Sequence, residues 1–259
     1  MPRGRVLDRP RPARYPPRVR ARGSPDIAMT DPALRPHRNF YGRTHGKTLR
    51  RSQKTYLTED LEVLRLPGVT FDENPDRHPL DLAARFGGRL VWLEIGFGGG
   101  EHLVHMAGLH PEVGLIGCEP FVNGIAMALG KLRAAEGGNV AIHPGDVRDL
   151  FDVLPDAALS KVFLNYPDPW PKARHHRRRF VTPEYLLPLA RACAPGAELR
   201  VATDIPDYVR QTLEEVPPAG FDLIRHSGEP WADWISTRYE QKALREGRVP
   251  DYLTFRRCG

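Results

Sequence analysis

Five carboxylates accompany short apolar runs of the chain, one inside the first run, near its end, and one just beyond each of the next four. They are Glu94, Glu119, Asp146, Asp168 and Asp204. A carboxylate accepts hydrogen bonds from a ribose diol or a base edge, and it stabilises positive charge that develops nearby. If the runs are neighbouring parallel strands, all five acids lie on one edge of a sheet. A single acid there often only caps a helix or turn, but five together predict a ligand site.

A glycine-rich turn follows the first apolar run. Residues 94–100 read EIGFGGG, and glycines at such a place let the backbone approach a ligand and begin a helix. A dinucleotide-binding G-x-G-x-x-G sequence starting at Gly96 needs glycine at position 101, where the chain has Glu101. The turn therefore disfavours a dinucleotide, and glycines that serve only tight packing are the alternative to a cofactor site.

A stiff loop follows the fourth apolar run. It reads NYPDPWPK over residues 165–172, and its alternate prolines neither donate to a sheet nor continue a helix. A segment with five positive charges, two histidines and no acid continues from it over residues 172–180. We expect this segment to hold nucleic-acid phosphates while Asp168 meets one base. Trp170 is a candidate to stack on that base, or to plug the loop against the core.

The elements that must position these residues follow from the periodicity of apolar residues. Predicted strands cover residues 89–95, 113–118, 139–143, 161–166, 197–202, 221–226 and 252–257. Predicted helices cover residues 101–109, 121–136, 147–154, 183–194, 206–216 and 236–246. Strands that alternate with helices are typical of βαβ units, so the pattern predicts an α/β fold with a parallel sheet.

The charge of the chain is unevenly distributed. The formal net charge is +6, and residues 1–28, with eight arginines, two aspartates and six prolines, account for all of it. We expect these residues to be a disordered leader without function, with an RNA-binding tail as the alternative. Residues 33–56 carry seven basic residues and no acid, with aromatic residues among them. This pattern suits RNA or an ordinary basic arm. The expected organisation is leader 1–28, basic arm 29–80 and catalytic domain 81–259.

Several classes of protein are disfavoured. Three scattered cysteines without C-x-x-C spacing argue against a disulfide framework or a structural zinc site and favour a reducing cytoplasm. No apolar run is long enough to span a membrane, and the chain begins without the apolar stretch of a secretory signal. His102, His105, His110 and His143 read as helix-surface or strand-end residues, so we expect no metal site.

Several motifs together resemble those of bacterial tRNA (guanine-N7)-methyltransferases. The chain has PDPW at 167–170 followed by Lys172 and the cluster 174–179, Ala-Thr-Asp at 202–204, and TRYE at 237–240. The G-x-G-x-G turn preceded by an acid is similar to the first motif of class I S-adenosylmethionine-dependent methyltransferases, whose cofactor carries a sulfonium instead of a pyrophosphate. The resemblance extends from about residue 38 to the end of the chain.

The resemblance implies a Rossmann-like class I methyltransferase fold with seven strands, mostly parallel, and helices on both faces. It implies S-adenosyl-L-methionine as cofactor and methylation of a variable-loop guanine of tRNA, at position 46, on N7. Asp168 is then the active-site acid. The implied cofactor-binding residues are Glu94, Gly96, Gly98, Gly100, Glu119, Asp146 and Asp168. The implied substrate-binding residues are Lys172, Asp204, Thr237, Arg238, Tyr239 and Glu240, and we add Arg174, Arg177, Arg178 and Arg179 as RNA-binding residues.

Other interpretations of the same residues remain open. Without the resemblance, Asp204 is equally a helix cap, and Arg238 with Glu240 is an ordinary surface pair. An amino-group methyltransferase has two prolines after its acid, whereas Asp168 has one on each side. A non-catalytic RNA-binding protein on the same fold predicts an eroded glycine turn. We expect a monomer that needs no protein partner, with a homodimer as the alternative.

Overall fold

The computed structural model describes residues 38–135 and 138–259, so the predicted leader and the first part of the predicted arm lie outside the described residues. The described residues form one compact unit. Residues 38–80, which the sequence suggested as a separate arm, are part of that unit. Within the described residues, no helix has the length and apolar character needed to cross a membrane.

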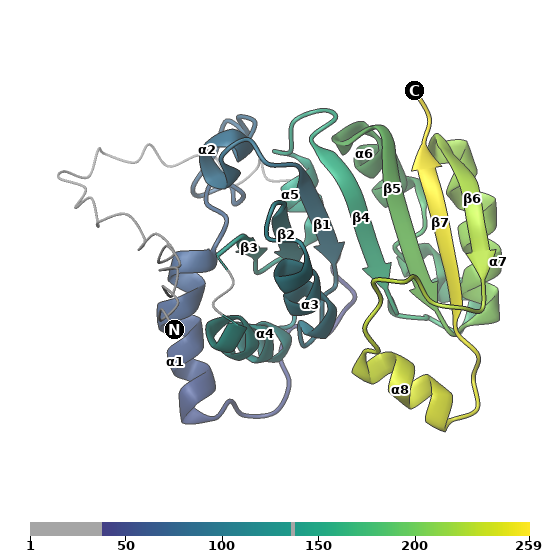
Figure 1. Ribbon diagram of the computed structural model, residues 1–259, viewed down its shortest axis with the longest axis horizontal. Helices are drawn as coiled ribbons and strands as arrows, with labels where there is room; N and C mark the ends of the chain where they lie inside the picture. The colour runs from purple at the N-terminus through teal and green to yellow at the C-terminus, as the bar shows by residue number, and fades with distance from the viewer. Residues whose placement is uncertain (1–37, 136–137) are drawn as a thin grey trace, which may run out of the picture. The chain divides into compact units, whose positions relative to one another are not determined.

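In the described part of the chain, seven strands form one sheet in the order β3-β2-β1-β4-β5-β7-β6 (Figure 1). The strands are β1 (Val91–Ile95), β2 (Gly114–Cys118), β3 (Val140–His143), β4 (Leu159–Asn165), β5 (Cys193–Thr203), β6 (Phe221–Ser227) and β7 (Asp251–Arg257). Strand β7 is antiparallel to both neighbours, and the pairs from β3 to β5 are parallel. The predicted seven-stranded, mostly parallel sheet is confirmed.

Helices cover both faces of the sheet. The helices α1 (Arg51–Leu64), α3 (Glu101–Leu109) and α4 (Val122–Ala135) pack together on one face, and α5 (Val147–Phe151), α6 (Pro183–Ala192) and α7 (Pro206–Glu215) lie on the other (Figure 1). The shorter helices are α2 (Leu82–Phe86), η2 (Ala173–Arg178), η3 (Pro217–Ala219) and α8 (Arg238–Arg245).

The central strands are apolar at successive positions because both faces of the sheet are buried. Successive side chains of a strand point to opposite faces. In β1, Leu93 and Ile95 join the hydrophobic cluster under α5, α6 and α7, whereas Trp92 joins the cluster under α1, α3 and α4. In β4, Phe163 points to the Trp92 side and Leu164 to the other. Two separate cores thus hold the sheet rigidly between helix layers.

The segment before β1 extends the fold beyond what the sequence indicated. Helix α1, which the sequence did not predict, packs against α4 and buries Leu64. After α1 the chain runs alongside β3, where the amide of Leu66 donates to the carbonyl of Ile142 at 2.9 Å. Leu66 and Val69 are both buried in the core. The basic residues before α1 are therefore attached to a folded element.

The strand order reverses between β1 and β4. The chain moves outward from β1 to β3 and then returns to place β4 on the other side of β1. At such a switch point the connections diverge, which opens a crevice beyond the carboxyl ends of the strands. Of the five acids predicted at the strand ends, Glu119, Asp146 and Asp168 lie at this crevice.

Candidate active site

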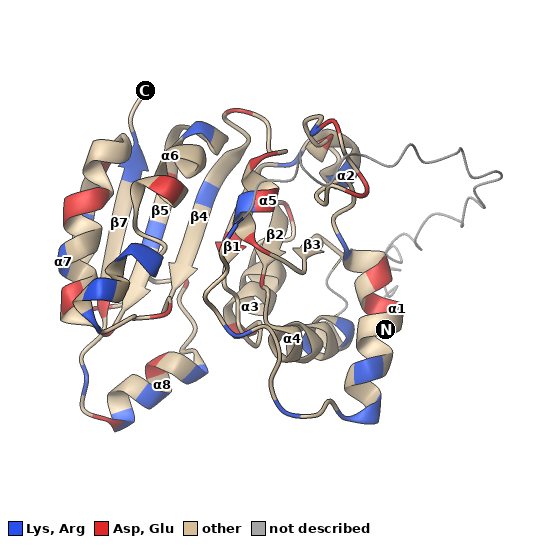
Figure 2. Ribbon diagram, turned by 180° about the vertical axis from the view of Figure 1, so that it is seen from behind, with Lys and Arg blue, Asp and Glu red and all other residues tan. Residues whose placement is uncertain are grey.

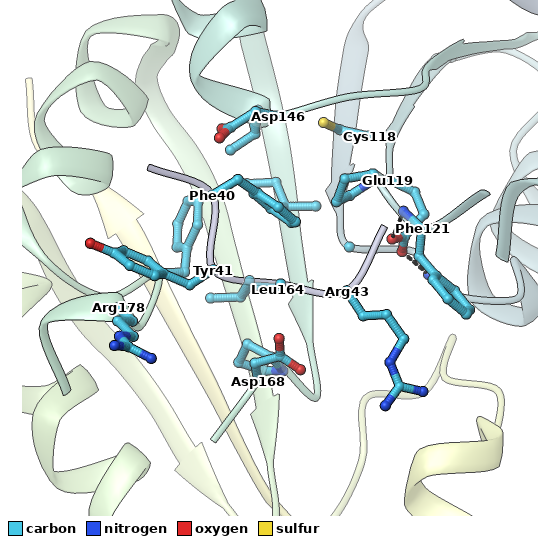
Figure 3. A pocket seen from close by; sticks show the side chains of 18 of the residues that line it. Phe40, Tyr41, Arg43, Cys118, Glu119, Phe121, Asp146, Leu164, Asp168 and Arg178 are labelled. Carbon is cyan, nitrogen blue, oxygen red and sulfur yellow. Dashed lines mark hydrogen bonds between the residues drawn. The ribbon is translucent and has the colours of Figure 1, made fainter. Parts of the chain in front are cut away.

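A cavity of about 440 Å³ lies beyond the carboxyl ends of β1, β2, β3 and β4 (Figure 3). Each strand contributes the residues that follow it, and residues 40–43 and Tyr239 add to the lining. Of the predicted site residues, the lining includes Gly96, Gly98, Glu119, Asp146, Asp168, Arg178 and Tyr239. The volume lies within the range of roughly 300–1,000 Å³ typical of small-molecule sites.

The glycine turn after β1 has a backbone that other residues rarely adopt. Gly96, Gly98 and Gly100 have φ values of 69°, 55° and 75°. A Cβ on Gly96 would meet nothing within 4 Å, whereas one on Gly100 would collide with Ala128 of α4. Gly96 therefore opens the turn toward the cavity, and Gly100 allows α3 and α4 to pack closely.

Glu119 is buried at the end of β2, where its two carboxylate oxygens face different backbone amides. Oε2 accepts from the amide of Gly98 at 2.6 Å, and Oε1 accepts from the amide of Phe121 at 2.9 Å. Burial raises the pKa of Glu119, the two amides oppose this, and the charge of Asp168 adds to the rise. Because each oxygen has a second lone pair, the carboxylate keeps capacity for two further donors, as a ribose diol would supply.

Asp146 begins α5 and lines the cavity. Its Oδ1 accepts from the backbone amide of Arg148 at 2.9 Å, which caps the helix. The buried guanidinium of Arg148 contacts Oδ2 at 2.6 Å and also pairs with Glu184 at 2.6 Å. The arginine thus fixes the direction of the Asp146 side chain at the cavity wall.

Glu94 lies behind the glycine turn. It is buried, and its Oε2 lies 2.9 Å from Nδ1 of His102. Glu94 is not among the described residues that line the cavity. The prediction that His102 lies on a helix surface is wrong, since the ring is buried between Phe163 and Trp234. His143 is buried as well, and the described residues contain no cluster suited to a metal ion.

The loop after β4 is conformationally constrained on both sides of Asp168. Tyr166 and Trp170 have positive φ values of 50° and 40°, which are rare for residues other than glycine. Such conformations persist only where the surroundings hold them, and they concentrate at functional sites. Asp168 lies in the mouth of the cavity, and partial loss of water raises its pKa.

Arg179 attaches the loop that carries Asp168 to α7. Its side chain is fully buried; Nε donates to the carbonyl of Pro169 at 2.8 Å, and Nη1 contacts Asp207 at 2.8 Å and Gln211 at 2.9 Å. The assignment of Arg179 to RNA binding is wrong, because a guanidinium with no exposed surface does not reach a phosphate. It fastens the loop to α7 instead.

The remaining basic residues after the loop divide into two groups. The guanidinium carbon of Arg178 lies 4.5 Å from the ring centre of Tyr41 and 5.1 Å from that of Trp170. Lys172, Arg174 and Arg177 are exposed, and none of the described residues forms an ion pair with them. Arg178 thus joins the arm to the loop, and the other three present positive charge that no acid among the described residues neutralises.

Two of the four residues of the TRYE motif at the start of α8, Thr237 and Glu240, are buried. Thr237 caps the helix by accepting from the amide of Glu240, and both side chains are buried. Glu240 accepts from the indole of Trp234 at 3.0 Å and from the hydroxyl of Tyr252. The alternative of an Arg238 and Glu240 surface pair is therefore wrong.

The other two residues of the motif face the glycine turn. Arg238 pairs with Glu101 at the start of α3. A Cβ added to Gly98 would lie 3.1 Å from Cε2 of Tyr239, so the tyrosine ring stands directly over the turn. Asp204 does not line the cavity in the described residues; it pairs with Arg248 instead of capping a helix. Of the predicted substrate residues, Tyr239 alone is placed in the lining that the described residues form.

Sequence reasoning missed the contribution of the arm to this cavity. Phe40, Tyr41 and Arg43 line it, and Figure 3 shows their side chains spreading from one short segment, with Tyr41 directed toward Arg178. The mixture of basic and aromatic residues had indicated RNA binding for this segment. Nothing in its local pattern indicated which cavity it crosses.

Comparisons with known proteins agree with this geometry. A family model described as "Putative methyltransferase" matches residues 88–250. A tRNA (guanine-N(7)-)-methyltransferase of Cereibacter sphaeroides is 76% identical over 222 residues, which cover 86% of this chain and 92% of that protein. A protein of the same name from Paracoccus denitrificans is 72% identical over 223 residues, covering 86% of this chain and 96% of that protein.

Among solved structures, an antibiotic-related methyltransferase aligns with a TM-score of 0.52 at 19% identity, covering 75% of this chain and 99% of that chain. At this identity the similarity concerns the fold alone. It confirms the predicted Rossmann-like methyltransferase fold.

Proposed function

The chain belongs to the tRNA (guanine-N7)-methyltransferase family, and from this premise we propose that it transfers a methyl group from S-adenosyl-L-methionine to N7 of a guanine in the tRNA variable loop, at position 46. The observation that carries the proposal is that one cavity joins the glycine turn and Glu119 to Asp168. The residues proposed to bind the cofactor and the carboxylate proposed to face the guanine therefore line the same cavity.

The cavity suits the cofactor in the chemistry of its lining. Glu119 would accept the two hydroxyls of the ribose through its remaining lone pairs, and Asp146 would accept from the amino group of the adenine. Gly96 and Gly98 would border the methionine part, where a side chain at Gly96 would occupy open space. For Glu94 we propose an indirect contribution, because its carboxylate orients His102 behind the turn.

The cofactor, when bound, supplies an electrophilic methyl group on a sulfonium. The lone pair of guanine N7 forms the new C–N bond while the C–S bond breaks and its electron pair passes to sulfur. No proton leaves N7, so the reaction needs no general base. Positive charge moves onto the purine. The Asp168 carboxylate stabilises this charge directly, or it accepts hydrogen bonds from the N1–H and amino groups of the guanine. Alignment of the base over the cavity supplies much of the remaining rate.

The test is methylation of unmodified tRNA by the purified protein. Borohydride reduction followed by aniline cleaves RNA at N7-methylguanosine, so we expect one new scission at the variable-loop guanine and one additional methyl by mass mapping. A tRNA with adenine at that position is the control and should remain uncut. Methylation elsewhere, or no scission, would overturn the proposal.

We further propose that tRNA phosphates are held by exposed basic residues around the cavity. Support comes from Lys172, Arg174 and Arg177, which have no ion-pair partner among the described residues. Figure 2 adds basic residues on α8 and on the loop that leads into α1, at the end of the molecule toward which β4 and β5 point.

Replacing Arg174 and Arg177 together with alanine should flatten the salt dependence of tRNA binding. For every phosphate that the protein no longer neutralises, the slope of log K against log salt becomes shallower by about 1. The measurement is tRNA affinity at several salt concentrations. The matched control replaces Arg89 and Arg256, two exposed arginines outside the cavity rim, and should leave the slope unchanged. Equal slopes for both double variants would remove Arg174 and Arg177 from the RNA surface.

A further inference from the structure

The arm segment, defined as residues 38–47, crosses the mouth of the cavity and is fastened at its first end to α5. Arg38 pairs with Asp149 at 2.7 Å and with Asp152 at 2.8 Å. The guanidinium of Arg148 donates to the carbonyl of Asn39 at 3.0 Å. Because Arg148 also orients Asp146, this end of the arm segment is tied to the wall that we assign to the adenine.

The far end of the arm segment is fastened to the start of α4. The amide of Val122 donates to the carbonyl of Thr44 at 2.9 Å. The carboxamide of Asn123 bonds the backbone twice: its Oδ1 accepts from the amide of Gly46 at 2.7 Å, and its Nδ2 donates to the carbonyl of Lys47 at 2.7 Å. Only a side chain with both a donor and an acceptor makes this pair of bonds.

Space at this contact is tight. A Cβ on Gly46 would lie 2.8 Å from the ring of Phe121 and 3.0 Å from Oδ1 of Asn123. Phe121 itself lines the cavity. The arm segment is thus packed as well as hydrogen-bonded against residues 121–123.

Residues 119–123 both line the cavity and hold the arm segment. At their beginning, Glu119 accepts from the amides of Gly98 and Phe121 and faces the cavity. At their end, Val122 and Asn123 hold the arm segment. A ligand that bonds to Glu119 and the arm segment that docks on Asn123 therefore both contact the turn formed by residues 119–123.

We propose that Asn123 is a positioning residue that holds the arm segment over the cavity and couples its docking to the presence of the cofactor. The inference rests on the proposed function, because it requires that the cavity bind S-adenosyl-L-methionine. With the arm segment docked, Phe40 and Tyr41 narrow the mouth and slow release of the cofactor. Coupling of this kind is reciprocal, so a bound cofactor also holds the arm segment in place.

The coupling extends toward the RNA side. Tyr41, in the middle of the arm segment, contacts Arg178, which also contacts Trp170 of the loop that carries Asp168. An arm segment released from Asn123 no longer holds Tyr41 against Arg178. Docking of the arm segment therefore orders the base-facing wall of the cavity together with the cofactor-facing wall.

The test titrates S-adenosylhomocysteine, the product form of the cofactor, into the full chain and its variants by calorimetry. Asn123→Ala removes both hydrogen bonds and should raise the Kd about tenfold. Asn123→Asp keeps the acceptor for Gly46 but loses the donor to Lys47, so an intermediate Kd is expected. Gly46→Ala displaces the same contact from the side of the arm and should also weaken binding.

The matched control is Asn74→Ala. Its carboxamide likewise bonds backbone groups, but within the 68–78 turn, to Gly68 and His78. This variant should lose some stability and keep the Kd of the unmodified chain. Comparison with Asn74→Ala therefore distinguishes the general effect of losing a hydrogen-bonded carboxamide from the specific effect of releasing the arm segment.

Hydrogen exchange of residues 38–47 is the second readout. In the unmodified chain, S-adenosylhomocysteine should slow exchange in this segment, and in Asn123→Ala the slowing should disappear. An unchanged Kd in Asn123→Ala, or exchange in 38–47 that ignores the ligand, would overturn the coupling alone. If the unmodified chain does not bind S-adenosylhomocysteine, the proposed function fails, and the coupling fails with it.

Discussion

Replacement of Asp168 by alanine is expected to lower the single-turnover rate of methyl transfer by two to three orders of magnitude while tRNA affinity changes little. In the proposed reaction the carboxylate would lie beside the purine on which positive charge develops, and removing one preorganised group of this kind costs about 10²–10³ in rate. We propose that the phosphates, which dominate RNA affinity, are held by the exposed basic residues outside the cavity. An interaction made mainly in the transition state lowers the rate more than it lowers binding.

Single-turnover kinetics at saturating cofactor, together with a tRNA-binding titration, check this expectation. Asp168→Asn separates the two possible roles, because asparagine keeps an acceptor oxygen but has no charge. A rate close to that of the unmodified enzyme in Asp168→Asn would assign the residue to holding the base. Equal losses of rate and of tRNA affinity in Asp168→Ala would contradict its place at the reacting centre.

The pH dependence of the rate should report the same group. Partial loss of water raises the pKa of Asp168, so its charge is lost at a higher pH than for an ordinary aspartate. The rate therefore falls as the pH is lowered through this raised pKa, and the fall should be absent in Asp168→Asn. Glu119 also has a raised pKa, but its protonation should weaken cofactor binding, so saturating cofactor separates the two effects.

Replacement of Arg179 by alanine is expected to destabilise the fold by about 2–3 kcal/mol. The change leaves the buried amide oxygen of Gln211 and the partly buried carbonyl of Pro169 without their donor. Asp207 is partly exposed, so water replaces part of that interaction, and the cost falls below that of a fully buried ion pair. The loop around Asp168 also loses its fastening to α7, so the methylation rate should fall as well.

Urea unfolding monitored by tryptophan fluorescence measures the change in the free energy of unfolding. The control is Arg177→Ala, two residues earlier in the same basic run, which should cost no more than about 0.5 kcal/mol because Arg177 is exposed. Arg179→Lys keeps the charge but lacks the planar donor set, and should recover only part of the stability. If Arg179→Ala unfolds at the same urea concentration as Arg177→Ala, the loop is held by other contacts.

Acidic and basic residues occupy different places around the cavity. The cavity wall is acidic at Glu119, Asp146 and Asp168, which suits a cofactor with a positively charged sulfur. Arg174 and Arg177 of η2 and Arg43 and Lys47 of the arm segment are exposed, and none of the described residues forms an ion pair with them. The structure therefore separates the place where a sulfonium would react from the place where phosphates would be held.

The sequence by itself determined the sheet and the positions of the acids along it. Apolar runs predicted the seven strands, because a strand buried on both faces is apolar at successive positions. Glu119, Asp146 and Asp168 then had to share one edge, since the carboxyl ends of parallel strands lie together. The glycine turn was equally visible, because Gly96, Gly98 and Gly100 occupy backbone conformations that other residues avoid.

Only the tertiary structure decided which residues of a motif are exposed. Arg177 and Arg179 belong to one basic run, yet the first is exposed and the second lies under α7. Glu240 is polar and near the end of the chain, yet Trp234 and Tyr252 enclose it. Asn123 has no distinctive sequence context, and its role comes from residues 46 and 47, which the fold places beside it. The burial and pairing of a side chain depend on partners that are distant in sequence, so the local sequence pattern does not predict them.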